Sequence, residues 1–196
     1  MPAFEFLAKA LVAFLLGSIP FAYIAVKAFG RKDIRQVGEG NPGAANASRA
    51  CGPAVGAAVL VFDAMKGLLT VYFLVKGASY WQRPALAIMP VLGHAFSPWL
   101  GFKGGKAITT SFGIWTALTI WEAPVAMGAG ALFSSFLMKS KSDFAKVMPI
   151  ITSLVIFLLA ARKGPDLWAL FVANTAVLVI KQAQYSSAAV MRSKRQ

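Results

Sequence analysis

Two short glycine-rich runs carry the polar residues of this chain that are best suited to chemistry. Residues 38–49 read Gly-Glu-Gly-Asn-Pro-Gly-Ala-Ala-Asn-Ala-Ser-Arg, and residues 102–106 read Phe-Lys-Gly-Gly-Lys. Glycines let backbone N–H groups converge on an anion, and nearby amide and cationic side chains can complete its binding shell. The two runs together predict a site for a phosphorylated compound.

In the first run we expect an anion cradle built from glycines, asparagines and one arginine. Arginine binds phosphate oxygens through two parallel hydrogen bonds, and asparagine supplies a neutral donor. The alternative is a flexible connector rich in glycine and asparagine, because one such run alone is weak evidence. The ordered spacing and the final arginine favour a cradle. Its predicted members are Gly38, Gly40, Asn41, Gly43, Asn46 and Arg49.

In the second run, Lys103 and Lys106 flank Gly104 and Gly105 just before an apolar segment. If a helix begins near Gly105, its first N–H groups add to the anion site. The alternative is a pair of interfacial lysines that extend toward lipid headgroups. That alternative suits Lys103, whereas Lys106 is the better phosphate ligand because it stands beside the glycines at the expected helix start.

Three ionisable residues lie within or near the ends of apolar segments. His94 is the only histidine and is a candidate general base, phosphate donor or buried hydrogen-bonding residue. The structural role is at least as well supported as catalysis. Asp63 and Lys66 are three residues apart, so a helix would place them on one face. They are either a functional pair or a pair that packs helices, and both interpretations are kept.

The composition is that of a membrane protein. The chain has 196 residues, of which 58% are hydrophobic and 14% charged, whereas a soluble domain carries about 25% charged residues. The net charge of +13 does not indicate nucleic acid, because the basic residues lie in short connections between apolar blocks. One cysteine and one histidine exclude an internal disulfide and argue against a zinc site.

The apolar blocks predict an all-α integral membrane protein, a bundle of about seven transmembrane helices in one domain over residues 1–196. Several blocks are shorter than the roughly 20 residues that a perpendicular span needs. One or two of these blocks can therefore be interpreted as re-entrant segments. The fourth and fifth can also be interpreted as one broken helix, which would give five or six spans. The predicted spans are residues 4–29, 53–75, 84–102, 107–121, 123–138, 147–161 and 167–180.

Seven spans divide the basic residues unevenly between the two sides of the membrane. Most lie in the first, third and fifth connections and at the C-terminus, whereas the other side holds only Lys9, Lys76, Arg83, Arg162 and Lys163. Because cytoplasmic loops carry the excess of Lys and Arg, we predict an external N-terminus and a cytoplasmic C-terminus. Both glycine-rich runs then face the cytoplasm.

The ordered motifs resemble the bacterial acyl-phosphate:glycerol-3-phosphate acyltransferase family, integral enzymes of phospholipid synthesis in the cytoplasmic (inner) membrane. This resemblance implies transfer of an acyl group from acyl phosphate to the 1-hydroxyl of glycerol 3-phosphate, giving lysophosphatidic acid without a metal or other cofactor. It adds Ser18 to the expected substrate-binding residues. The motifs that carry it are Gly17-Ser18-Ile19-Pro20, residues 38–46 with Arg49, Asp63-Ala64-Met65-Lys66-Gly67, Gly93-His94, and residues 102–106.

The chain departs from that family's pattern at several positions. Glu39 and Ala45 stand where the family usually has serine and threonine, and residues 181–185 lack the family's expected histidine and asparagine. A carboxylate opposes phosphate binding unless it is turned away or paired. We expect Glu39 to pair with a nearby cation such as Arg35.

Two functions follow from these residues. In the first, Arg49 and Lys106 neutralise phosphate charge, and His94 or a substrate phosphate oxygen takes the hydroxyl proton, so His94 and Lys106 are the predicted catalytic residues. Without a Ser-His-Asp set, no covalent acyl-enzyme is expected. The alternative is a non-catalytic binding protein or transporter for a phosphorylated lipid or metabolite. Membrane lipids, acyl phosphate and glycerol 3-phosphate are the expected partners.

Overall fold

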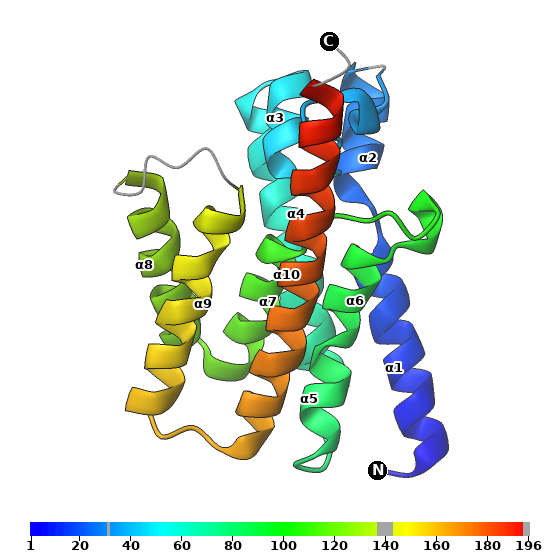
Figure 1. The fold of residues 1–196 in the computed structure, drawn as a ribbon. Coiled ribbons are helices and arrows are strands. Elements are labelled where there is room, and N and C mark those ends of the chain that lie inside the picture. The colour runs from blue at the N-terminus through cyan, green and yellow to red at the C-terminus, as the bar shows by residue number, and fades with distance from the viewer. Residues whose placement is uncertain (31, 137–142, 194–196) are drawn as a thin grey trace.

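The computed structural model describes residues 1–30, 32–136 and 143–193, and the secondary structure of these residues is entirely helical. Most of the longer helices run side by side in a bundle, with the start of α1 and the end of α10 at opposite ends (Figure 1). The α-helices are α1 (Ala3–Ser18), α2 (Phe21–Ala25), α3 (Ala44–Cys51), α4 (Pro53–Leu74), α5 (Gln82–Ala87), α6 (Met89–Ala95), α7 (Ile108–Thr119), α8 (Glu122–Phe136), α9 (Asp143–Ala160) and α10 (Pro165–Ser193).

Proline and glycine set several helix boundaries. Pro20 stands in the break between α1 and α2, where a residue without a backbone N–H cannot continue the hydrogen-bond ladder. Gly52 ends α3 with φ of 92°, a left-handed conformation that favours glycine, and Pro53 then opens α4. The chain thus turns sharply between α3 and α4, which places α3 at the end of the bundle.

The predicted spans correspond to helices, although two of them are divided. The segment 53–75 forms α4 almost to the residue. The first span is broken into α1, α2 and a short π-helix (Val26–Gly30), and the third into α5, α6 and a 3-10 turn. The fourth and fifth are separate helices, α7 and α8, and the residues between them include Ile120 with φ of 60°. Among the described residues, three segments are long and apolar enough to cross a membrane: Ala3–Gly30, Pro53–Leu74 and Pro165–Ser187.

A buried polar chain joins α7 to α10 inside the largest apolar cluster. The indole of Trp115, which is fully buried, donates to Asn174 Oδ1 at 3.0 Å. Asn174 Nδ2 donates in turn to Ser111 Oγ at 2.7 Å, and that hydroxyl donates to the Ala107 carbonyl at 2.9 Å. Buried polar groups are tolerated when each finds a partner. These bonds fix the start of α7, where the second glycine-rich run ends, against the last helix.

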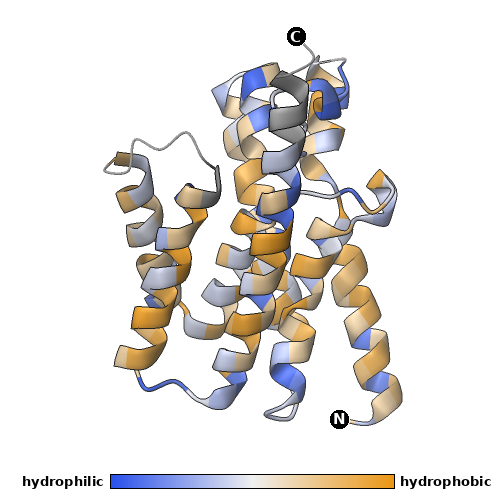
Figure 2. Cartoon of the chain, in the orientation of Figure 1, coloured by the Kyte–Doolittle hydropathy of each residue, from blue (hydrophilic) through white to orange (hydrophobic). Residues whose placement is uncertain are grey.

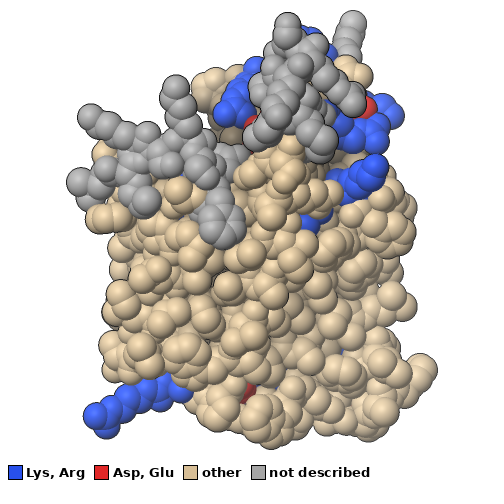
Figure 3. Space-filling model, viewed as in Figure 1, with Lys and Arg blue, Asp and Glu red and all other residues tan. Residues whose placement is uncertain are grey.

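The outer faces of the bundle are apolar, and the charges gather at its ends. Exposed large hydrophobic residues occur on α1, α4, α8, α9 and α10. Figure 2 shows hydrophobic residues along most of the helix lengths and hydrophilic ones mainly at the ends. In the face drawn in Figure 3, Lys and Arg gather around the end that carries α3, extend from there down one side, and reappear at one corner of the other end. This distribution suits a bilayer, in which the apolar band meets the hydrocarbon.

The packing of α4 on α7 leads to a stability prediction. A methyl group on Gly113 would collide with the backbone carbonyl of Ala64, so these helices approach closely only without a side chain there. We expect Gly113→Ala to lower the midpoint of thermal unfolding in detergent by several degrees, because overpacking costs about 1–3 kcal/mol. Gly128→Ala is the matched control, since a methyl group there meets nothing within 4 Å. Equal midpoints for the two variants would contradict this view of the packing.

Candidate active site

A cavity of about 380 Å³ lies between the first glycine-rich run, α4 and the start of α7. Its wall contains both cations that the sequence singled out as the best phosphate ligands, Arg49 and Lys106, together with the histidine. The residues that line it are Glu39, Asn41, Gly43, Ala44, Ala45, Arg49, Leu60, Asp63, His94, Lys106, Ala107, Ile108, Thr109 and Lys146. The sequence runs 38–49 and 102–106, about sixty residues apart, thus contribute to one site.

The first run is part loop and part helix. Gly38 and Gly40 have φ of 54° and 80°, so the loop uses the left-handed backbone that glycine allows. The helix α3 then begins at Ala44, and it places Asn46 and Arg49 three residues apart on one face. Asn46 Oδ1 accepts a hydrogen bond from Arg49 Nη1 at 2.6 Å. The sequence analysis missed α3, whose end is signalled by the glycine-proline pair at 52–53.

Asn41 joins the first run to the second. Its side-chain oxygen accepts a hydrogen bond from the backbone N–H of Lys106 at 3.2 Å, and its carbonyl accepts one from Asn46 Nδ2 at 3.0 Å. The second run is held on its other sides as well. The carbonyl of Gly104 accepts from the Tyr185 hydroxyl at 2.8 Å, and the N–H of Gly105 donates to the carbonyl of His94 at 3.0 Å. Three separate elements therefore fix the backbone that carries Lys106.

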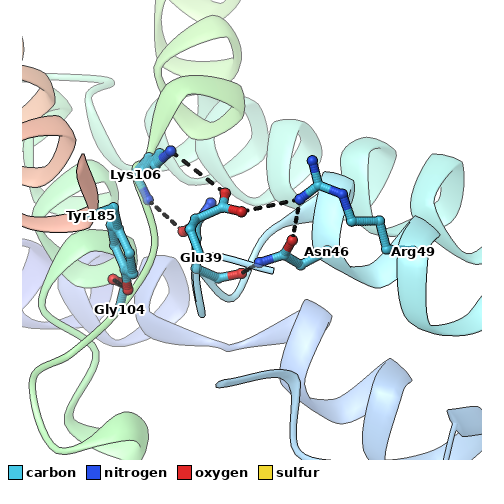
Figure 4. Close-up of polar contacts among 7 residues, drawn as sticks. Glu39, Asn46, Arg49, Gly104, Lys106 and Tyr185 are labelled. Carbon is cyan, nitrogen blue, oxygen red and sulfur yellow. Dashed lines mark hydrogen bonds and ion pairs between the residues drawn. The ribbon is translucent and has the colours of Figure 1, made fainter. Parts of the chain in front are cut away.

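Glu39 contacts both cations of the cavity (Figure 4). Its carboxylate lies 3.0 Å from Arg49 Nη1 and 3.6 Å from Lys106 Nζ. The expectation that Glu39 pairs with a cation is confirmed, but the proposed partner was wrong. Arg35 makes its ion pair with Asp33 at 2.7 Å, and its hydrogen bonds lower the pKa of Asp33. The carboxylate of Glu39 thus contacts Arg49 and Lys106, the two cations that the sequence predicts to bind phosphate.

The first turns of two helices also face this cavity. Ala44 and Ala45 begin α3, and Ile108 and Thr109 begin α7. The first N–H groups of a helix lack intrahelical partners and carry partial positive charge, which favours an anion. The second helix begins at Ile108, one residue after the predicted start of the fourth span at 107, and Ala107 adopts a left-handed φ of 61° just before it. Two helix N-termini therefore add partial positive charge to the wall that holds Arg49, Lys106 and Glu39.

A buried charged cluster supports the floor of the cavity. Lys66 Nζ lies 2.7 Å from Asp63 Oδ1 and donates to the Ile19 carbonyl at 2.8 Å, which confirms the predicted contact on one helix face. His94 Nδ1 lies 3.6 Å from the same carboxylate oxygen. On the opposite side of the ring, a methyl group on Gly105 would collide with His94 Nε2, so the imidazole packs directly on the second run. This geometry favours a positioning role for His94. The sequence analysis did not include Asp63 among the site residues, although an ionisable group within a span signals function.

The remaining predicted site residues lie outside the cavity wall. Ser18 Oγ donates to the Leu15 carbonyl at 2.7 Å and accepts from the Trp99 indole at 2.9 Å, which holds the 3-10 turn at Pro98–Leu100 against α1. Lys103 is exposed to solvent. Gly38, Gly40, Asn46, Gly104 and Gly105 shape the two runs without lining the cavity. Substrate binding by these residues stays a prediction.

Comparison with known proteins places this site in a family context. A family model described as glycerol-3-phosphate acyltransferase matches residues 7–191. A protein named glycerol-3-phosphate acyltransferase from Mesorhizobium japonicum is 36% identical over 169 residues, which cover 86% of this chain and 84% of the relative. A protein of the same name from Endomicrobium trichonymphae is 40% identical over 130 residues, which cover 64% of this chain. This match spans 65% of the relative's length, just under two thirds.

The fold is similar to that of a solved membrane enzyme. The crystal structure of PlsY (YgiH), an integral membrane glycerol 3-phosphate acyltransferase, in its glycerol 3-phosphate form superposes with a TM-score of 0.81. The two chains are 27% identical, and the match covers 91% of this chain and 88% of the other. This likeness supports the all-helical membrane fold predicted from the sequence.

The geometry of the cavity predicts where an anion binds. Arg49→Ala should raise the dissociation constant for inorganic phosphate about tenfold, because losing a hydrogen bond to a charged group costs about 1.5–3 kcal/mol. Lys76→Ala is the control, since it removes the same charge from an exposed residue beyond the far end of α4. Isothermal titration of the purified proteins in detergent measures both. Equal small effects would mean that residues 38–49 are only a connector.

Proposed function

Because this chain belongs to the glycerol-3-phosphate acyltransferase family, we propose that it transfers an acyl group from acyl phosphate to the 1-hydroxyl of glycerol 3-phosphate. The product is lysophosphatidic acid, an intermediate of phospholipid synthesis. The observation that carries this proposal is the convergence of Arg49, Lys106 and the first turns of α3 and α7 on one cavity. Such a site can hold anionic substrates and neutralise the charge that develops during transfer.

In this reaction the protein needs to do little covalent chemistry. The bond between the acyl carbon and the phosphate oxygen breaks, a bond from that carbon to the acceptor oxygen forms, and the hydroxyl proton passes to the departing phosphate. The substrate is already activated, so positioning and electrostatic stabilisation suffice. Lys106 contributes its ammonium group at the centre of the site, and Arg49 holds the phosphate of the acceptor through its guanidinium group.

The proton is best assigned to the departing phosphate. Of the two bases considered from the sequence, His94 has Nδ1 beside Asp63 and Nε2 against Gly105. His94 lines the cavity, but a general base must also reach the proton that it removes, and both nitrogens of this ring face protein groups. We therefore assign His94 to positioning: its carbonyl and its ring both support the second glycine-rich run.

For the membrane arrangement we propose the one that the sequence predicts. We propose that seven segments cross the bilayer, with the N-terminus outside and the C-terminus in the cytoplasm. The two described ends of the chain lie at opposite ends of the bundle (Figure 1), as an odd number of spans requires. The cavity lies at the end that carries α3, so it would open to the cytoplasmic side, where phosphorylated metabolites are found.

The non-catalytic alternative is not favoured. It was suggested by Glu39, Ala45 and the absent histidine and asparagine near the C-terminus. Glu39 is paired in the structure, and Ala45 lies in the first turn of α3, where its backbone rather than its side chain serves an anion. Tyr185, in the divergent segment, supports the second run through its bond to Gly104. The residues that depart from the family pattern are therefore compatible with a cavity whose wall still holds Arg49 and Lys106.

The topology has a direct test. Reporter fusions after Gln196 and within the loop at Asn41 should both report the cytoplasm, because cytoplasmic loops hold most of the Lys and Arg residues. Activity of a cytoplasmic reporter and inactivity of a periplasmic one at each position is the expected pattern. Opposite signals from the two positions would rule out seven spans.

The pairing of Glu39 leads to a kinetic prediction. Its carboxylate competes with phosphate for Arg49 and Lys106, so Glu39→Gln should lower KM for glycerol 3-phosphate. We expect a decrease of up to about fivefold, since a partly exposed ion pair contributes about 0.2–1 kcal/mol. Asp33→Asn is the control, because it removes the same charge from the neighbouring pair with Arg35. A higher KM in Glu39→Gln would show instead that the carboxylate mainly holds the two runs together.

A further inference from the structure

A separate cavity of about 150 Å³ lies between the starts of α5 and α10 and the end of α7. Figure 1 shows α5 and the start of α10 at one end of the bundle, with α3 at the other, so this cavity is remote from the candidate active site. At about 30 Å³ for each water in the liquid, the space suits a small polar group and not an acyl chain. The residues that line it are Arg83, Pro84, Leu118, Asp166, Leu167 and Leu170.

Arg83 and Asp166 bring opposite charges to this wall without pairing with each other. At the same end of the bundle, Glu122 and Lys163 do form an ion pair, at 2.9 Å. Among the residues that the structure describes, neither the guanidinium of Arg83 nor the carboxylate of Asp166 has an ion pair or a side-chain hydrogen bond. Two opposite charges held apart around one cavity fit a ligand that carries both signs of charge.

Aromatic side chains place this cavity at the level of lipid headgroups. Trp81, immediately before α5, and Trp121, between α7 and α8, are 65% and 67% exposed. Tyr80 packs edge-on against Trp81, and its hydroxyl accepts a hydrogen bond from the N–H of Asp166 at 3.3 Å. Trp and Tyr are enriched where a membrane meets water, because their rings are apolar and carry one polar group. A ligand at this depth is therefore expected to be the headgroup of a lipid.

We propose that this cavity binds the zwitterionic headgroup of a membrane phospholipid that carries a phosphate and a primary ammonium group. The Arg83 guanidinium pairs with the phosphate, whose oxygens match its parallel N–H donors. The ammonium group donates hydrogen bonds to the Asp166 carboxylate. Leu118 and Leu167 contact the carbon atoms of the headgroup. This site is distinct from the cavity near Arg49 and takes no part in the acyl transfer proposed above.

The carboxylate of Asp166 makes the site selective among phospholipids. A headgroup with a net negative charge meets like-charge repulsion from it. A quaternary ammonium group keeps the positive charge but has no N–H to donate. We therefore expect phosphatidylethanolamine to bind most tightly, phosphatidylcholine more weakly and phosphatidylglycerol most weakly.

Thermal unfolding of the purified full-length protein in detergent tests this order, because a lipid that binds only the native state raises the midpoint as its concentration increases. Titration with dihexanoyl phosphatidylethanolamine should give an apparent dissociation constant at least about twofold lower than titration with dihexanoyl phosphatidylglycerol. The difference reflects one partly exposed ion pair gained and a repulsion of similar size avoided. Equal constants for the two lipids would overturn the proposal.

Two variants assign the charges. Asp166→Asn should bring the two constants together, because it removes both the attraction for the ammonium group and the repulsion of the anionic lipid. Arg83→Gln should raise both constants, by up to about fivefold, because both headgroups contain a phosphate. Arg162→Gln is the matched control, since it removes the same charge from an exposed residue of the loop before α10 that does not line the cavity.

The outcomes are separable from those for the enzyme, because none of these measurements uses acyl transfer. The midpoint without lipid shows that each variant is folded, and the lipid order of the unmodified protein needs no variant. A preference for phosphatidylethanolamine that survives Asp166→Asn would reject the role of the carboxylate and with it the proposal. Equal effects of Arg83→Gln and Arg162→Gln would also reject it, since surface charge alone would then explain the binding.

Discussion

The site depends on one constraint: two cationic, glycine-rich segments that are far apart in sequence must be held against each other. The hydrogen bond from the Lys106 N–H to Asn41 Oδ1 supplies the backbone connection. The carboxylate of Glu39 lies between Arg49 and Lys106 and contacts both cations until an anion takes its place. With the two segments joined, two cations and two helix N-termini surround one cavity before an anion arrives.

Close backbone packing within the bundle holds the second glycine-rich segment in place. The ring of His94 packs against Gly105, and the His94 carbonyl accepts a hydrogen bond from the Gly105 N–H, so the second run is held against α6. Gly113 allows α7 to approach α4, and the buried chain through Ser111 and Asn174 ties the same helix to α10. The segment that carries Lys106 is therefore fixed from several directions. Preorganisation of this kind is what transfer from an already activated donor requires.

Much of the architecture was accessible from the sequence because a bilayer demands long apolar helices. The segment 53–75, for example, could be predicted from its hydropathy and from the proline at its start. Asn41, Arg49 and Lys106 could be singled out because two glycine-rich cationic runs in one chain both indicate an anion site. The short helix α3 was missed because eight residues between a glycine and a proline carry little periodicity. Of the two partners of Glu39, Arg49 is ten residues away but lies on the missed helix α3, and Lys106 lies in the other glycine-rich run. Both contacts therefore depend on the folded arrangement and are not encoded in local spacing.

The central claim is that Lys106 stands where the two substrates meet. The most direct test is the rate at which the purified protein forms lysophosphatidic acid from acyl phosphate and glycerol 3-phosphate, compared with that of Lys106→Met. This change keeps the backbone N–H that bonds to Asn41 and removes only the ammonium group. The account predicts product from the unmodified protein and a rate at least about 10²-fold lower in the variant, the cost of losing one group that stabilises developing charge. A variant that retains half of the rate, or an unmodified protein that forms no product, would contradict it.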